Sequence, residues 1–205
     1  MADEAAPYSV VFDLGAVLID WNPRHLYRQL LPDEAAMEHF LATVCTPEWN
    51  EEQDAGRPFA EGIALLCEQH PHHAELIHAY FKRWHEMLGG PIHSTVAILE
   101  RLHKRGVPLF ALTNWSAETF PQARARFEFL KLFRGILVSG EERLKKPDPV
   151  IYQRMLTRFG LSAPRSVFID DSEKNVRAAR ELGMIALRFH SPSELERELA
   201  RLGLL

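Results

Sequence analysis

Four groups of polar residues stand at or just after the ends of predicted β-strands. They are Asp13, Thr113–Asn114, Lys145–Lys146 and Asp170–Asp171. Taken singly, each is explained by helix capping, a turn or a solvated loop. Taken together, they supply three carboxylates, one or two ammonium groups and a hydroxyl, an inventory that suits a hard divalent cation and a phosphate.

The elements that must position these residues alternate between strand and helix. Because such alternation favours a parallel sheet, whose ligands bind outside the carboxyl ends of the strands, the polar groups are expected on one rim. Strands are predicted over Ser9–Phe12, Val107–Leu112, Ile136–Ser139, Ser166–Ile169 and Met184–Leu187, with helices over Ser94–Lys104, from near Ser116, over Asp148–Phe159 and over Glu173–Leu182. Ser193 and Glu196 form a capping-box pair that predicts a short terminal helix.

The stretch from about Pro23 to Gly90 has a different character. It consists of amphipathic helical segments separated by turn signals. We therefore predict an α/β fold with a Rossmann-like, doubly wound parallel sheet and an inserted all-helical cap. The predicted domains are residues 1–20 and 91–205 for the sheet and 21–90 for the cap.

The acidic pair Asp170–Asp171 is the predicted centre of a magnesium site. Mg²⁺ prefers oxygen ligands and commonly shares one or two carboxylates with a substrate phosphate. Neighbouring residues in an extended segment point in opposite directions, so only one of the pair need touch the metal. Asp171 is the favoured ligand, and Asp170 is expected to bind through water or to support the site.

Four ordered motifs carry a resemblance to a known family. The segments Val11–Leu18, Leu112–Asn114, Lys146–Tyr152 and Phe168–Ala179 resemble the motifs of the haloacid dehalogenase superfamily. Within it, the chain is similar to the helical-cap (C1) subgroup of sugar-phosphate phosphatases with an Asp-Leu-Gly first motif. The resemblance implies a Rossmann-like core, a cap inserted after the first motif, and Mg²⁺-dependent hydrolysis of a small phosphorylated metabolite.

The resemblance also implies roles for individual residues. Asp13 would be the nucleophile that forms an aspartyl-phosphate, and it would share the metal with the carbonyl of Gly15. Thr113 and the backbone around Asn114 would hold phosphate oxygens. Lys146 would balance charge on the nucleophile and on the transferring group.

Gly15 marks a departure from the family pattern. Most phosphatases that the chain resembles carry a second aspartate two residues after the nucleophile, where it protonates the leaving group and activates water. Here that position is a glycine. Asp20 is a candidate replacement, although capping or hinge formation before Asn22–Pro23 also explains it.

Two other functions stay open on the sequence alone. In a 2-haloacid dehalogenase the same aspartate attacks carbon and halide leaves without a proton or a metal, which fits Gly15. The relatives with that activity resemble each other in a neutral Ser-Asn type segment where this chain has Asp170–Asp171, and two carboxylates would repel a carboxylate substrate. A non-catalytic relative is the third possibility, supported by Gly15 alone.

Substrate choice is expected to depend on the cap. Arg57 and Asp54 are positioned near a turn to grip hydroxyls or an anionic group, although solvated turn residues are commoner. Among the tryptophans, Trp115 is the best placed to contact the substrate, because it directly follows Thr113–Asn114, the predicted phosphate-binding residues. The other tryptophans, at positions 21, 49 and 84, are more often packing residues than ligand platforms.

Composition limits the classes of partner. The 205-residue chain has a formal net charge of −4 and a sequence pI near 6.2, with no basic stripe for nucleic acid. Met1–Pro7 carries acids rather than a basic leader, and no apolar run approaches the roughly 20 residues that span a bilayer. We expect a cytoplasmic monomer or homodimer with a small-molecule partner. Cys45 and Cys67 are expected to be free thiols.

Overall fold

The sheet of the computed structural model has five parallel strands in the order β5-β4-β1-β6-β7. The structure describes residues 8–205, so the acidic segment Met1–Pro7 lies outside the described residues. The strands are β1 (Ser9–Phe12), β4 (Leu109–Thr113), β5 (Gly135–Val138), β6 (Ser166–Asp170) and β7 (Ile185–Arg188). The strand order reverses at β1, which confirms the predicted doubly wound α/β fold.

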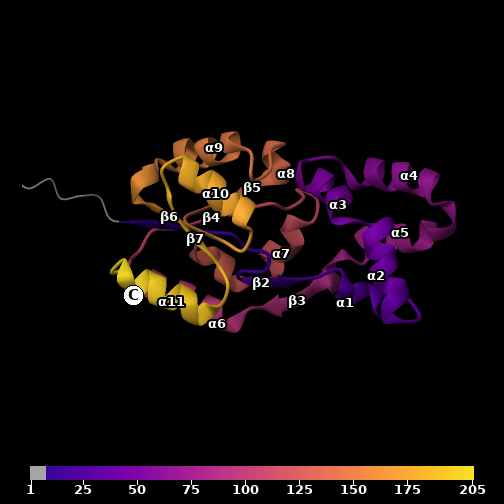
Figure 1. The fold of residues 1–205 in the computed structure, drawn as a ribbon, viewed down its shortest axis with the longest axis horizontal. Helices are drawn as coiled ribbons and strands as arrows, with labels where there is room; N and C mark the ends of the chain where they lie inside the picture. Colours follow the sequence, from indigo (N-terminus) through magenta and orange to yellow (C-terminus); the bar gives the residue numbers. More distant parts are fainter. Residues whose placement is uncertain (1–7) are drawn as a thin grey trace, which may run out of the picture.

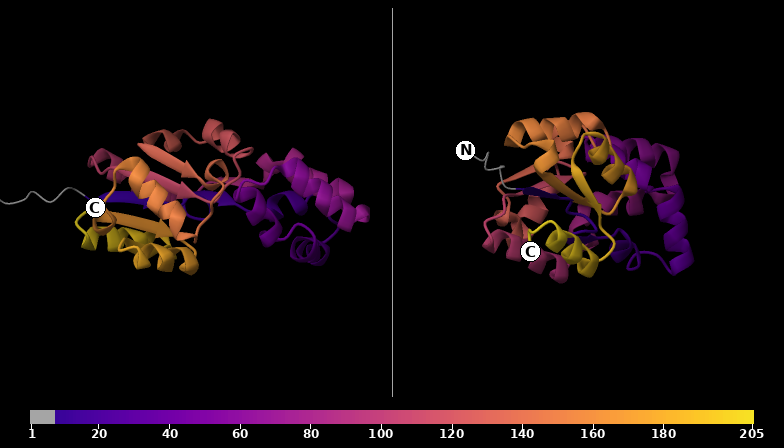
Figure 2. Two further views of the ribbon diagram at one scale, coloured as in Figure 1. Left: turned by 90° about the horizontal axis from the view of Figure 1, so that it is seen from above. Right: turned by 60° about the vertical axis from the view of Figure 1, so that its left-hand side comes forward.

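Helices cover both faces of this sheet (Figures 1 and 2). Along β1, Val10 and Phe12 point into one buried cluster and Val11 points into another, as the alternation of a strand requires. The first face is covered by α6 (His93–Lys104), α7 (Phe120–Arg126), η3 (Glu128–Leu132) and α11 (Pro192–Arg201), and the second by α9 (Pro149–Phe159) and α10 (Glu173–Glu181). Short elements complete the layer at α8 (Ser139–Glu142) and η4 (Ala163–Arg165).

Two predicted helix starts are wrong by a few residues. The terminal helix is capped by Ser191, whose side chain accepts the backbone N–H of Glu194 at 3.3 Å, rather than by Ser193. Pro192 then occupies the first helical position, where its fixed φ and missing N–H cost nothing. The helix expected from near Ser116 begins at Phe120, because residues 116–119 form the turn that leaves the end of β4.

A second, helical layer of the molecule lies beyond the carboxyl ends of the strands (Figure 2). It contains α1 (Arg24–Tyr27), α2 (Glu34–Thr43), α3 (Pro47–Asp54), α4 (Phe59–Gln69), η1 (Pro71–His73), α5 (Ala74–Lys82) and η2 (Trp84–Met87). We call residues 24–87 the cap, and the sheet with its covering helices the core. The cap has aromatic packing of its own, in which the rings of Trp49 and Tyr80 lie 5.0 Å apart.

A two-stranded antiparallel ribbon joins cap and core. It pairs β2 (Ile19–Trp21) with β3 (Leu88–Pro91) and was not expected from the sequence. The ribbon crosses both proposed domain boundaries, between residues 20 and 21 and between residues 90 and 91. The division into two domains therefore stays a proposal.

Two smaller expectations concern cysteines and membranes. Cys45 and Cys67 are both free thiols. In the described part of the chain no helix combines the length and apolar character that crossing a membrane requires.

Candidate active site

Three carboxylates meet at the carboxyl end of the sheet. β1 lies beside β6, so Asp13 and the pair Asp170–Asp171 leave neighbouring strands at the same rim. One oxygen from each carboxylate lies within 4.8 Å of the others. They form the one cluster of at least three potential metal-ligating side chains within residues 8–205.

Lys146 lies in the middle of this cluster. Its side chain is fully buried, and its Nζ lies 2.9 Å from Asp13 Oδ1 and 2.7 Å from Asp170 Oδ2. The same ammonium donates a hydrogen bond to the carbonyl of Leu112 at 2.9 Å. Lys145, its neighbour in the sequence, instead pairs with Glu51 of the cap at 2.8 Å, so a single lysine serves the cluster.

Asp170 and Asp171 differ in how their oxygens are used. Asp170 is fully buried and accepts hydrogen bonds from Lys146, from the backbone of Ser172 at 2.8 Å and from the side chain of Asn175 at 3.0 Å. Asp171 is exposed at the rim. Its carboxylate is therefore the freer of the two to bind a cation directly, and the ligand role expected of it stays a prediction.

The donor set fits a divalent cation. When all groups are ionised, three carboxylates against one ammonium leave an excess of two negative charges in a largely buried cluster. Like charges at this separation oppose one another's ionisation unless a cation offsets them. Oxygen ligands alone, without thiolate or imidazole, favour magnesium or a similarly hard ion. Asp13 and Asp171, with the carbonyl of Gly15, would hold it.

The electrostatics of the cluster follow from burial. Burial raises the pKa of Asp13 to about 7, even though Lys146 acts in the opposite direction. Burial alone would lower the pKa of Lys146, but the carboxylates of Asp13 and Asp170 raise it above its ordinary value. Lys146 is therefore a permanent cation, whereas Asp13 needs more positive charge nearby to stay ionised at neutral pH.

Thr113 is the last residue of β4 and Asn114 follows it, and their side chains make different contacts. The side chain of Asn114 exchanges two hydrogen bonds with the backbone of Lys146, of 3.0 and 2.8 Å, and so fixes the lysine loop against β4. Thr113 is 1% exposed, and its Oγ1 has no hydrogen-bond partner in the described structure. A buried hydroxyl without a partner is costly, and Thr113 shares this feature with Thr95 and Thr119.

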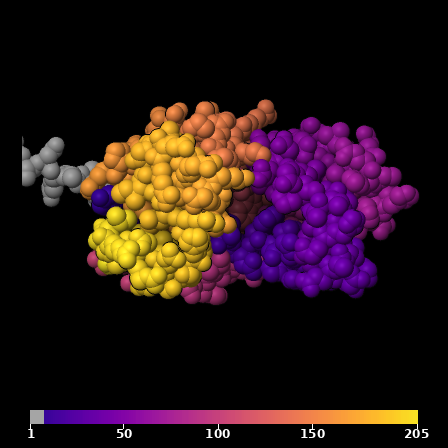
Figure 3. Space-filling model, viewed as in Figure 1, coloured from indigo at the N-terminus to yellow at the C-terminus, as the bar shows by residue number. Residues whose placement is uncertain are grey.

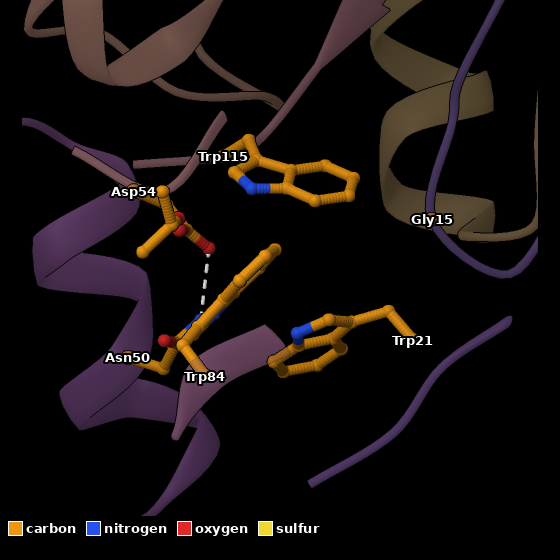
Figure 4. Close-up of a pocket in the computed structure, with 7 residues that line it drawn as sticks. Gly15, Trp21, Asn50, Asp54, Trp84 and Trp115 are labelled. Carbon is orange, nitrogen blue, oxygen red and sulfur yellow. Dashed lines mark hydrogen bonds between the residues drawn. The ribbon is translucent and has the colours of Figure 1, made fainter. Parts of the chain in front are cut away.

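A cavity of about 50 Å³ opens at Gly15 between cap and core. Figure 4 shows Trp21, Trp84 and Trp115 lying between Gly15 and Asp54. The lining residues are Gly15, Trp21, Asn50, Asp54, Trp84, Trp115 and Thr119. Figure 3 shows the cap, in indigo to purple, resting directly against the core from which Gly15 comes.

The remaining candidates from the sequence lie elsewhere. Asp20, on β2, has a half-exposed side chain and an Oδ2 that lies 2.9 Å from His25 Nε2, and it does not line the cavity. Arg57 holds the cap together by donating to the side chain of Gln53 at 2.7 Å and to the carbonyl of Trp49 at 3.2 Å. Neither is brought to the carboxylate cluster.

Sequence reasoning missed two residues of the cavity wall. Asn50 stands four residues before Asp54 on α3, and that i,i+4 spacing on a helix was the available signal for a polar pair. Thr119 had no signal, because it lies in the turn between β4 and α7. Its buried Oγ1 has no partner in the described structure, and the same holds for the Nε1 of Trp115. Both residues belong to the cavity wall.

Comparisons with known proteins show the family and the fold of the chain. The family model described as haloacid dehalogenase-like hydrolase matches residues 33–188, a range that begins after Asp13. A sesquiterpene phosphatase of Aspergillus oryzae is 30% identical over 182 residues, covering 88% of this chain and 89% of the relative. A haloacid dehalogenase family enzyme of Bacteroides thetaiotaomicron, solved with magnesium and inorganic phosphate, has a TM-score of 0.70 at 21% identity, covering 93% of this chain and 99% of that one. The L-2-haloacid dehalogenase of Xanthobacter autotrophicus has a TM-score of 0.65 at 16% identity, covering 97% of this chain and 84% of that one.

Proposed function

The chain belongs to the haloacid dehalogenase-like hydrolase family, and from this premise we propose that it is a magnesium-dependent phosphatase of a small phosphorylated metabolite, a sugar phosphate. The observation that carries the proposal is the cluster of Asp13, Asp170 and Asp171 around the buried Lys146. Its excess negative charge suits a cation and, through it, a phosphate. The 30% identical phosphatase of Aspergillus oryzae supports the same reaction class.

The reaction begins at Asp13. Its Oδ1 is fixed by the backbone N–H of Leu14 at 2.7 Å and by Lys146, so the other carboxylate oxygen is left to attack phosphorus. The resulting aspartyl-phosphate is then hydrolysed by water. Lys146 offsets negative charge as it develops, and Thr113 Oγ1 donates to an oxygen of the transferring phosphoryl group.

Magnesium, when bound, would neutralise phosphate charge and orient the phosphoryl group for attack. Asp13, Asp171 and the Gly15 carbonyl would hold it, while Asp170 keeps Lys146 in place. The solved relative with magnesium and phosphate supports this assignment by fold alone.

Chelation is expected to remove activity and lower stability together. Treatment with excess EDTA should abolish phosphate release, and added Mg²⁺ should restore it. Because the ion binds the folded carboxylate cluster, Mg²⁺ at 100 times its Kd should stabilise the fold by about 2.7 kcal/mol, seen as a rise in Tm. Asp171→Asn should weaken both effects. Activity and Tm that ignore EDTA would contradict the metal site.

Thr113→Val tests the phosphate contact. Loss of a hydrogen bond to a charged group should lower kcat/KM by about 10- to 100-fold. Stability should stay constant or rise, because valine removes a buried hydroxyl that has no described partner. Thr95→Val is the matched control, since Thr95 Oγ1 is also buried without a described partner but Thr95 belongs to neither the carboxylate cluster nor the cavity wall. Equal activity of the two variants would remove Thr113 from the site.

The cavity at Gly15 favours a small, hydroxylated leaving group. At about 50 Å³ it is small. Asn50, Asp54 and Thr119 add polar side chains to the cavity wall, and such groups can bond to hydroxyls. These polar residues and the small volume support a sugar phosphate.

Dehalogenation is the second candidate, favoured by Gly15. The fold is shared with the L-2-haloacid dehalogenase of Xanthobacter autotrophicus, and halide leaves without a proton donor. The paired carboxylates Asp170 and Asp171 oppose it, because they would repel a carboxylate substrate. Phosphate release from a panel of sugar phosphates, nucleotides and acyl phosphates, measured beside chloride release from 2-chloropropionate, separates the two. Magnesium-dependent phosphate release supports our proposal, and metal-independent chloride release would replace it.

A further inference from the structure

The space usually filled by the second aspartate of the first motif is open here. Gly15 has no side chain, and outside residues 14–16 no described heavy atom lies within 4 Å of the position that a Cβ would take there. The cavity between core and cap begins at this point. A leaving group attached to a phosphate at Asp13 can therefore extend past Gly15 into the cavity.

Asp54 is the single ionisable side chain among the described residues that line this cavity. The rest of the wall is tryptophan, asparagine, threonine and glycine. Figure 4 shows Asp54 on the wall across from Gly15, with the three indole rings between them. The indoles give apolar walls to the space that a leaving group would occupy. Asp54 is thus the available source of a proton in a cavity without another acid.

Asp54 is held by both the cap and the core. It is the last residue of α3, and its Oδ2 accepts a hydrogen bond from Asn50 Nδ2 at 3.0 Å. Its backbone carbonyl accepts from Ser139 Oγ at 2.5 Å, and the same Ser139 hydroxyl accepts from the backbone N–H of Trp115 at 2.8 Å. A cap residue is therefore tied to the loops that follow β4 and β5, close to the phosphate-binding end of the core.

The surroundings of Asp54 keep it partly protonated near neutral pH. Burial raises the pKa of Asp54 to about 7, and Glu51 on the same helix adds to the rise. The backbone N–H of Ser116 and the ammonium of Lys145 act in the opposite direction. Tyr80 of α5 also faces Asp54, and burial raises the pKa of its phenol far above neutrality, so it stays uncharged.

Asp20, the replacement acid considered from the sequence, lacks these properties. Its side chain is 49% exposed, and it pairs with His25. It also lies on β2, outside the cavity wall. The comparison leaves Asp54 as the better placed carboxylic acid.

We propose that Asp54, carried by the cap, is the general acid and base that replaces the aspartate missing at Gly15. The inference rests on the proposed phosphatase function. In the first step Asp13 forms a bond to phosphorus, the bond from phosphorus to the leaving oxygen breaks, and the proton of Asp54 moves to that oxygen, so an alcohol departs. In the second step the oxygen of a water molecule forms a bond to phosphorus, the bond from Asp13 to phosphorus breaks, and the Asp54 carboxylate takes a proton from that water. Phosphate leaves, Asp13 is regenerated, and Asp54 is protonated again.

Asp54→Asn tests this role through the leaving group. The amide keeps the size of the side chain but carries no transferable proton. On the best sugar phosphate of the panel, whose alkoxide needs a proton, kcat should fall by about 10²- to 10⁴-fold. On p-nitrophenyl phosphate, which expels a stable phenolate, the fall should be at least about tenfold smaller. Glu52→Gln, which removes an exposed carboxylate two residues earlier on α3, should leave both rates unchanged.

The pH profile gives a second readout. A general acid must be protonated, so kcat/KM of the wild type on the sugar phosphate should fall as the pH rises through about 7. Asp54→Asn should lack this falling limb. Its Mg²⁺-induced rise in Tm should match that of the wild type, because the substitution is outside the carboxylate cluster.

The outcomes distinguish failure of the proposed phosphatase function from failure of the role proposed for Asp54. If the wild type releases no phosphate from any substrate, the proposed function fails. If the wild type is active and Asp54→Asn changes the sugar phosphate and p-nitrophenyl phosphate rates by the same factor, whether large or none, Asp54 is not the acid. A rate loss confined to the sugar phosphate, together with the lost pH limb, establishes it.

Discussion

Asp13→Asn is expected to abolish phosphate release while the fold is retained. The catalytic groups act as a unit, so removal of the nucleophile should lower kcat by at least about 10⁴-fold. The remaining groups can hold phosphate but cannot form the covalent intermediate. The measurement is phosphate release with saturating Mg²⁺ beside circular dichroism of both proteins. Residual activity within tenfold of the wild type, or about 1.4 kcal/mol in barrier height, would mean that another group attacks phosphorus.

Stability gives an independent test of the same residue. The pKa of Asp13 is raised from 3.8 to about 7 by burial, so ionising it costs folding free energy. In metal-free wild type, the stability that Asp13 provides is present below pH 4 and lost as the pH rises towards 7. Asparagine has no such titration. Urea unfolding in EDTA should therefore show that the free energy of unfolding of Asp13→Asn rises relative to that of the wild type between pH 4 and pH 7. If the difference in unfolding free energy between the two proteins did not change with pH, the burial of this charge would be contradicted.

The parts of the fold that local sequence determines could be predicted. The strand Ser9–Phe12 was expected and found with the same bounds, because four β-branched, small or aromatic residues end at an acid and a glycine. The carboxylate cluster could also be expected, since the ends of parallel strands share one rim. No hydrogen-bond detail was needed to bring Asp13, Lys146 and Asp170 together.

The relation between cap and core could not be predicted. The strands β2 and β3 are only three and four residues long. Leu88–Pro91 also contains two glycines and a proline, which are poor strand formers. Its pairing is imposed by tertiary contacts. The same holds for Asp54, whose place depends on a hydrogen bond to Ser139, 85 residues away in the chain. No spacing pattern encodes such a contact, so the sequence suggested Asp54 for a substrate contact without showing which one.

Lys146→Met should be the most destabilising change at the site as well as an inactivating one. The fully buried ammonium lies between Asp13 and Asp170, and the methionine stem fills the same volume without the charge. Asp170 is fully buried and would be left as an uncompensated carboxylate, a situation that typically costs about 3–5 kcal/mol. Activity should fall with it, because no cation would face the transferring phosphoryl group.

Lys145→Met is the matched control for that change. This neighbouring lysine pairs with Glu51 at the partly exposed junction of cap and core, and a pair of this kind contributes about 0–1 kcal/mol. Guanidinium unfolding of the two variants at pH 7 should therefore separate them clearly. Adding Asp170→Asn to Lys146→Met should recover part of the lost stability but none of the activity, because it removes the unpaired charge without restoring the cation. Equal stability of the two lysine variants would mean that Asp170 is not held as a buried anion, and the charge balance on which the metal site rests would have to be redrawn.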